Sequence, residues 1–234
     1  MQMQVVPPHS VNKFSTVSRS IVAQFVQFAG DETPMRSLTA ITILAFGACL
    51  AASALPATAA PLTFTCDPGH TAVRASWTHA GFSTQSAGFH KPECTLVLDE
   101  ADPTKSSLSV KIMVASINTG VPDLDADIKS ANFFDAAKNP EITFASTSVT
   151  VKDKTAEVVG NLTMHGISKP ATLKVSLVNM GEHPVGQFFD YYKGKWAGFD
   201  ASTTIKRSDF GMNMMVPVVS DDITISISTE MKGQ

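Results

Sequence analysis

The stretch from Glu157 to Val178 constrains the fold most, because it has the pattern of two amphipathic strands folded back on each other. Apolar residues recur at every second position, which is typical of half-buried antiparallel strands. One face carries Val158, Gly160, Leu162 and Met164 on the first arm, and Leu173, Val175 and Leu177 on the second. Gly166 suits a tight reversal, and Pro170 is expected to mark the edge of regular pairing. A single hairpin is unstable in water, so its apolar face must contact more sheet.

The same alternation recurs along most of the chain after Pro61, which predicts an all-β domain. Acidic residues in the first turn and a proline at the start predict one short helix over residues 122–130. The other expected strands span residues 62–66, 71–79, 95–99, 107–115, 142–146, 148–152, 197–206 and 222–230. Such a set closes as a sandwich or as an up-and-down barrel. A barrel of about eight strands has room inside for side chains or for one slender ligand.

The charge balance argues against nucleic-acid binding. The chain has 18 Lys and Arg against 21 Asp and Glu, a formal net charge of −3, and its cations are not clustered. A nucleic-acid-binding surface needs a concentrated patch of Lys and Arg. The charge therefore indicates ordinary solubility.

Residues 35–59 have the form of a secretory signal peptide. Arg36 precedes an uncharged apolar run over residues 38–55, and Ala57-Thr58-Ala59 supplies small residues where a signal peptidase cleaves. An uncleaved membrane anchor and lipidation at Cys49 are the alternatives. The pattern predicts a periplasmic protein whose mature domain covers residues 60–234. Residues 1–34 precede a complete signal sequence, so we expect them to be an upstream start-site artefact or a disordered segment.

Two cysteines, Cys66 and Cys94, belong to the expected mature domain. An even pair in an exported domain favours a disulfide between them. Two independent buried thiols are the alternative.

Five sequence stretches together resemble the YceI-like family of periplasmic, lipocalin-like proteins that bind polyisoprenoid lipids. They read D-P-G-H-T-A-V-R, N-T-G-V-P-D-L-D-A-D-I-K-S-A-N-F-F-D, P-E-I-T-F-A-S-T, G-N-L-T-M-H-G-I-S-K-P and G-F-D-A-S-T-T-I-K-R-S-D-F-G-M. They follow the family order and cover almost all of residues 61–234. The resemblance implies an all-β, lipocalin-like extended antiparallel barrel of about eight strands, with one or two short helices and a channel for a long isoprenoid tail. The Cys66/Cys94 pair and the loop Gln187–Trp196 depart from the family pattern at the expected channel mouth.

No catalytic or metal-binding pattern is present in the sequence. The histidines do not pair at ligand spacing, and no G-x-S-x-G or Cys/His nucleophile signal occurs. The acids of 123–127 resemble a calcium loop, but Ile128 and Phe134 occupy the positions that need glycine and a bidentate acid. We therefore expect no catalytic residues, no metal and no cofactor other than a bound polyisoprenoid or quinone lipid.

Apolar side chains are the better candidates for a binding site. The chain has 14 Phe and 10 Met, and both suit a flexible hydrocarbon because neither needs a polar partner. The candidate ligand-binding residues are Trp77, His79, Phe82, Phe89, Ile112, Phe133, Phe134, Phe144, Leu162, Met164, Phe199, Phe210, Met212 and Met214.

These observations favour a non-enzymatic protein that holds a polyprenyl or isoprenoid quinone chain for transport, storage or sequestration. An enzyme that uses a buried polar group such as His79 on a lipid, and a stress-related module with a filled barrel, are the alternatives. The expected partner is the isoprenoid lipid and not nucleic acid. A membrane, a membrane redox protein and a second copy of the chain are further candidate partners.

Overall fold

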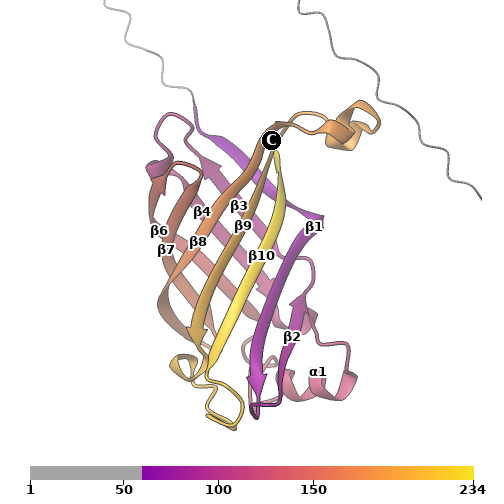
Figure 1. Cartoon of the computed structure of the whole chain (residues 1–234), viewed down its shortest axis with the longest axis vertical. Coiled ribbons are helices and arrows are strands. Elements are labelled where there is room, and N and C mark those ends of the chain that lie inside the picture. Colours follow the sequence, from indigo (N-terminus) through magenta and orange to yellow (C-terminus); the bar gives the residue numbers. More distant parts are fainter. Residues whose placement is uncertain (1–59) are drawn as a thin grey trace, which may run out of the picture. The chain divides into compact units, whose positions relative to one another are not determined.

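The computed structural model describes residues 60–234. The expected signal peptide and upstream segment lie outside the described residues. Within them the chain forms one large antiparallel sheet with a short helix α1, Pro122–Lys129 (Figure 1). The strands are β1 Leu62–His79, β2 Ser83–Phe89, β3 Glu93–Leu98, β4 Ser107–Met113, β5 Ile117–Asn118, β6 Glu141–Lys152, β7 Thr155–Met164, β8 Ile167–Glu182, β9 Lys195–Lys206 and β10 Asp222–Gly233.

The sheet closes into a barrel because β1 also pairs with β10. The same edge of β1 pairs with two different strands along its length. Leu62–Thr65 pair with β3, and Val73–His79 pair with β2. The closed ring therefore contains eight strands, β1, β3, β4, β6, β7, β8, β9 and β10, while β2 and β5 extend it locally. This confirms the expected all-β barrel and its short helix. None of the helices in residues 60–234 is both long and apolar enough to cross a bilayer.

The two ends of the barrel differ in their connections. The upper end in Figure 1 carries the β3–β4 and β6–β7 connections and the β8–β9 loop, residues 183–194. The lower end carries α1, the β7–β8 turn and the β9–β10 loop, residues 207–221. Arg207 is buried and fixes this lower loop, because its guanidinium donates hydrogen bonds to the carbonyl oxygens of Met212, Val219 and Ser220.

The central hairpin has the predicted partners. β6, β7 and β8 pair in order, and the β7–β8 turn places His165 and Gly166 at φ 51° and 72°. Two positive φ angles in a two-residue turn match the right-handed twist of the strands. His165 Nδ1 donates to the carbonyl oxygen of Phe210 at 2.8 Å, which ties this turn to the lower loop.

Two local predictions need correction. Pro170 does not mark the edge of pairing, because it lies within β8 opposite Asn161. The missing N–H is tolerated because β9 pairs with β8 only from Lys174 onward, so Pro170 lies where β8 has β7 alone as its neighbour. The gap expected between residues 66 and 71 is instead an irregularity within the continuous strand β1.

Candidate lipid-binding cavity

The upper half of the barrel encloses a cavity of about 360 Å³. That volume lies near the lower end of the range for small-molecule sites, about 300–1,000 Å³. Inward residues of every strand of the ring contribute to its wall. Its apolar lining includes Val73, Leu96, Leu98, Leu108, Val110, Ile112, Val149, Val151, Val158, Leu173, Val175, Leu177, Met180, Phe199, Ala201, Ile227 and Met231. This composition follows from the alternation in the sequence, because every second residue of a barrel strand faces inward.

The few polar groups in the middle of the wall satisfy one another. The hydroxyls of Thr71 and Thr229 share a hydrogen bond at 2.7 Å, and Thr229 also donates to Cys66 Sγ at 3.6 Å. Among the described residues, no buried side-chain N or O atom lacks a hydrogen-bond partner. The wall therefore offers a ligand mainly apolar contact, and each buried polar side chain in it already has a hydrogen-bond partner.

Charged residues line the cavity at its upper end. They are Glu100 in the β3–β4 connection and Asp153 and Lys154 in the β6–β7 turn. All three are exposed, and Lys195 Nζ pairs with Glu100 Oε1 at 2.6 Å. The charged residues that line the cavity therefore lie at this end alone.

Packed side chains close the lower end. Phe144, Leu162 and Phe89 are each less than 9% exposed and belong to one continuous core. Phe89 also contacts Phe134 edge to face, with ring centroids 6.5 Å apart. The barrel interior is thus hollow above and filled below.

The fourteen candidate ligand-binding residues divide between these regions. Ile112 and Phe199 line the cavity. Trp77 and Phe134 pack partly buried against the lower core, and Phe133 is half-buried with the Arg207 guanidinium 6.0 Å from its ring centroid. The fully buried members of the core are Phe89, Phe144, Leu162, Met164, Phe210 and Met212.

The remaining three candidates lie on the surface. Phe82 is 94% exposed, Met214 is 46% exposed, and His79 is also exposed. The backbone brings them near one end, because His79 bridges to Val219 and Ala80 N donates to the carbonyl oxygen of Val218. They do not line the cavity, so the sequence-based grouping of aromatics and methionines mixed interior and exterior positions.

The predicted disulfide is confirmed. Cys66 of β1 is bonded to Cys94 of β3, with 5.3 Å between the Cα atoms. That separation is usual for a disulfide. The bond crosslinks neighbouring strands and forms part of the cavity wall.

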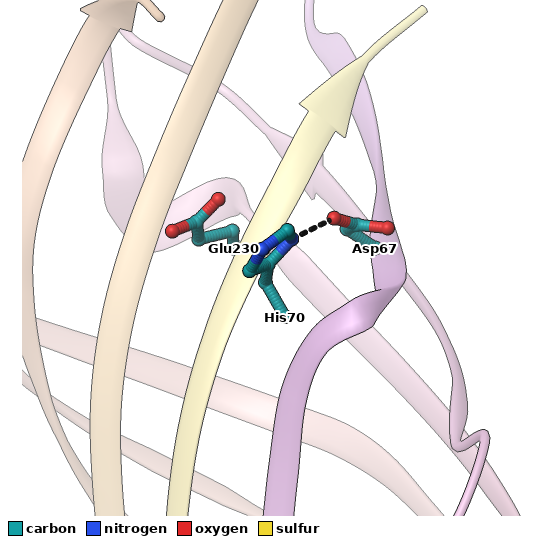
Figure 2. Close-up of side chains that lie close together, drawn as sticks. All are labelled: Asp67, His70 and Glu230. Carbon is teal, nitrogen blue, oxygen red and sulfur yellow. Dashed lines mark hydrogen bonds and ion pairs between the residues drawn. The ribbon is translucent and has the colours of Figure 1, made fainter. Parts of the chain in front are cut away.

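A second group of side chains lies on the outer face of the barrel and was not predicted. Asp67 and His70 of β1 and Glu230 of β10 place one potential ligand atom each within 4.8 Å of one another. Figure 2 shows the His70 imidazole directed at Asp67, where Nδ1 and Oδ2 are 2.6 Å apart, with Glu230 on the neighbouring strand. We call these three residues the outer cluster. It borders a groove of about 540 Å³ that His183, Gly181 and Gly198 also line.

Neighbouring groups shift the pKa values of His70 and Asp67 in the outer cluster. The hydrogen bond to Asp67 raises the pKa of His70, and the charge of Glu230 adds to this effect. Burial alone would raise the pKa of Asp67, but hydrogen bonds from His70, the Gly69 N–H and Tyr191 together lower it. Both shifts favour a charged pair. Spacing in the sequence does not reveal the cluster, because only strand pairing brings Glu230 beside β1.

Comparison with known proteins places the fold and the family. The model of the YceI-like domain family matches residues 64–231. A UPF0312 protein of Pectobacterium atrosepticum is 31% identical over 194 residues, which cover 83% of this chain and 94% of that protein.

Solved structures share the barrel. BcnA of Burkholderia cenocepacia is 22% identical, with a TM-score of 0.62 over 70% of this chain and 98% of that chain. A polyisoprenoid-binding domain from Saccharophagus degradans, implicated in plant cell wall breakdown, is 12% identical, with a TM-score of 0.53 over 74% of this chain and 98% of that chain. These likenesses support the same barrel architecture. The family match over residues 64–231 shows that the chain belongs to the YceI-like family.

Proposed function

We propose that the protein binds the hydrocarbon tail of an isoprenoid lipid, a polyprenyl chain or an isoprenoid quinone, in the cavity of its barrel. The main observation in support is the cavity itself, which is apolar along its length, closed below and charged only at its upper end. The polyisoprenoid-binding domain of Saccharophagus degradans, which has the same barrel, supports this ligand class.

The energetics of binding follow from the wall. Each Å² of apolar surface that a tail removes from water contributes about 25 cal/mol, and the wall demands no polar partner in return. The head group stays at the upper end, within reach of Lys154, Asp153 and Glu100. With about 360 Å³ available, the cavity holds a segment of a long chain rather than all of it.

We propose a binding protein rather than an enzyme. His79, the polar group considered for catalysis, is exposed and does not line the cavity. The lower half of the barrel is filled, as in the alternative of a stress-related module with a filled barrel. The upper half leaves room for a ligand. The signal-like residues 35–59 and the disulfide support an exported, periplasmic carrier or store. Delivery through a membrane or a membrane redox protein, and self-association, stay predictions.

Organic extraction of the purified protein followed by mass spectrometry tests the ligand class. The expected result is an isoprenoid lipid in an amount comparable to that of the protein. Binding of a fluorescent isoprenoid then tests the location. Ala201→Trp and Ile112→Trp fill the cavity and should abolish binding, whereas Ser202→Trp places the same side chain outside the barrel on the same strand β9. Normal binding by the folded Ala201→Trp and Ile112→Trp proteins would overturn the proposal.

A further inference from the structure

We propose that the outer cluster, Asp67, His70 and Glu230, is a binding site for a divalent transition-metal ion, with Zn²⁺ as the best fit. The site lies on the outside of the barrel and is separate from the lipid cavity. It does not depend on the proposed lipid function.

The irregularity in β1 creates the site. Cys66 pairs with Met231 and Thr71 pairs with Thr229, so residues 67–70 all lie opposite the single residue Glu230. A regular antiparallel pair would place one residue there. Bulges of this kind redirect side chains and occur often next to functional sites. Here the irregularity brings Asp67 and His70 of one strand beside Glu230 of the next (Figure 2).

The distances suit a chelate after small side-chain movements. One ligand atom from each residue lies within 4.8 Å of the other two. Zn²⁺ binds imidazole nitrogen and carboxylate oxygen at about 2.0–2.2 Å, so ligands on one ion lie roughly 3–4 Å apart. The cluster must contract slightly, and the ion must separate His70 Nδ1 from Asp67 Oδ2. The side chains of His70 and Glu230 are 49% and 40% exposed and are free to make these adjustments.

Asp67 is already oriented for this role. Its side chain is only 5% exposed, and Oδ1 accepts hydrogen bonds from the Tyr191 hydroxyl at 3.0 Å and the Gly69 N–H at 3.2 Å. These contacts occupy one carboxylate oxygen and leave Oδ2 facing His70. Hydrogen-bonded outer partners of this kind fix metal-ligating carboxylates in known sites.

Glu230 has an outer partner as well. His183 Nδ1 accepts the Val185 N–H at 3.2 Å, so its proton is on Nε2. Nε2 then donates to Glu230 Oε2 at 3.3 Å. This arrangement assigns His183 to orienting Glu230 and leaves the other carboxylate oxygen for the ion.

The donor set selects the class of ion. One imidazole and two carboxylates suit Zn²⁺ and its neighbours among divalent transition metals. Ca²⁺ and Mg²⁺ prefer oxygen donors alone, and Cu(I) prefers sulfur. The cluster borders the open groove, so water completes the coordination.

Isothermal titration of the chelator-treated full chain with ZnCl₂ tests the site. One Zn²⁺ ion per chain should bind with high affinity. Because loss of even an outer-shell partner costs 10–100-fold in affinity, His70→Ala and Glu230→Gln should each weaken binding by ~100-fold or more. His79→Ala is the matched control, since it removes an exposed histidine from the same strand β1 and should leave the titration unchanged.

Two further readouts separate metal binding from a structural role. Long-range ¹H–¹⁵N spectra should show the His70 imidazole shifting on Zn²⁺ addition, while the His79 signals stay in place. Circular dichroism checks that the variants stay folded, and Glu230→Gln preserves shape if His70→Ala does not. Absence of Zn²⁺ binding in the full chain, or binding that survives both folded variants, would overturn the proposal. Neither result bears on isoprenoid binding, so failure here is distinguishable from failure of the lipid function.

Discussion

Gly160 of β7 lies against the ring of Phe144 on β6. A Cβ at position 160 would overlap that ring and stand 2.6 Å from the carbonyl oxygen of Ala145. The absence of a side chain at Gly160 leaves room for the Phe144 ring, which packs in the same core cluster as Val158 of the cavity wall. The close approach therefore belongs to the packed core beneath the cavity.

We predict that Gly160→Ala destabilises the protein by about 1–3 kcal/mol, because overpacking forces the ring or the backbone to move. Urea unfolding measures the change. Gly88→Ala is the control, since its new Cβ would meet nothing closer than the Val73 carbonyl oxygen at 3.9 Å. Equal stability of the two variants would show that the Phe144 ring moves aside freely.

Enlarging the lower end of the cavity should change which isoprenoid tails the protein binds. Ile112 lines the cavity and is 8% exposed, so Ile112→Ala should cost about 2–5 kcal/mol of stability and add space beneath the ligand. Competition with a series of isoprenoid alcohols should show tighter relative binding of the longer members. Val178→Ala removes a 59% exposed side chain and should alter neither property. An unchanged chain-length preference in the folded Ile112→Ala protein would place the tail elsewhere.

Loss of the disulfide should be costly. Cys66 and Cys94 are 28 residues apart, and closing a loop of that length stabilises a fold by about 3–4 kcal/mol in the chain-entropy account. The Cys66→Ser/Cys94→Ser double variant should unfold at correspondingly lower urea concentration. Thiol labelling of the unfolded, non-reduced full chain should modify Cys49 alone. Labelling at Cys66 or Cys94 would contradict the bond.

Acid should weaken the lower loop through Asp221. Burial alone would raise its pKa, but hydrogen bonds from the Ser208 N–H at 2.9 Å and the Ser208 hydroxyl at 2.7 Å outweigh burial and lower it. Because the folded-state pKa is depressed, the stabilisation is complete above the ordinary aspartate value, about 3.9. It is lost as the pH falls through the lower folded value.

Asp221→Asn should therefore lower the urea midpoint at neutral pH and have a much smaller effect in acid below both pKa values. Asp222→Asn is the matched control, because Asp222 is 63% exposed and, within residues 60–234, its carboxylate forms an ion pair only with the exposed Lys206, a contact of small value. A constant difference between Asp221→Asn and the parent protein across this pH range would contradict the assignment.

Alternation in the sequence was sufficient to predict the strands of the closed ring, because inward and outward positions differ in polarity along β4, β7, β9 and β10. It did not predict β2 and β5, and the turn-rich residues 81–88 mostly belong to β2. It could not show how deep an inward residue lies. Ile112 and Leu162 carry the same signal, yet Ile112 lines the cavity and Leu162 packs in the solid core. Depth depends on strand stagger and on the side chains of several neighbouring strands, which no single segment encodes.

The loops and the outer cluster were harder still to predict. Phe82 and Met214 resemble pocket residues in composition, but they lie in connections where the period of two no longer assigns a face. The cluster needs both the irregularity after Cys66 and the register of β10 against β1. Neither is visible as spacing between Asp67, His70 and Glu230 in the sequence.

The pairing of Thr71 with Thr229 bears on selectivity. Because these hydroxyls bond to each other, the largely apolar wall offers little to a polar functional group of a ligand. Under the proposed function, discrimination between one head group and another would fall to Glu100, Asp153 and Lys154, which belong to exposed connections. Connections tolerate substitution far better than barrel strands, so one scaffold can acquire new lipid preferences while its interior stays unchanged.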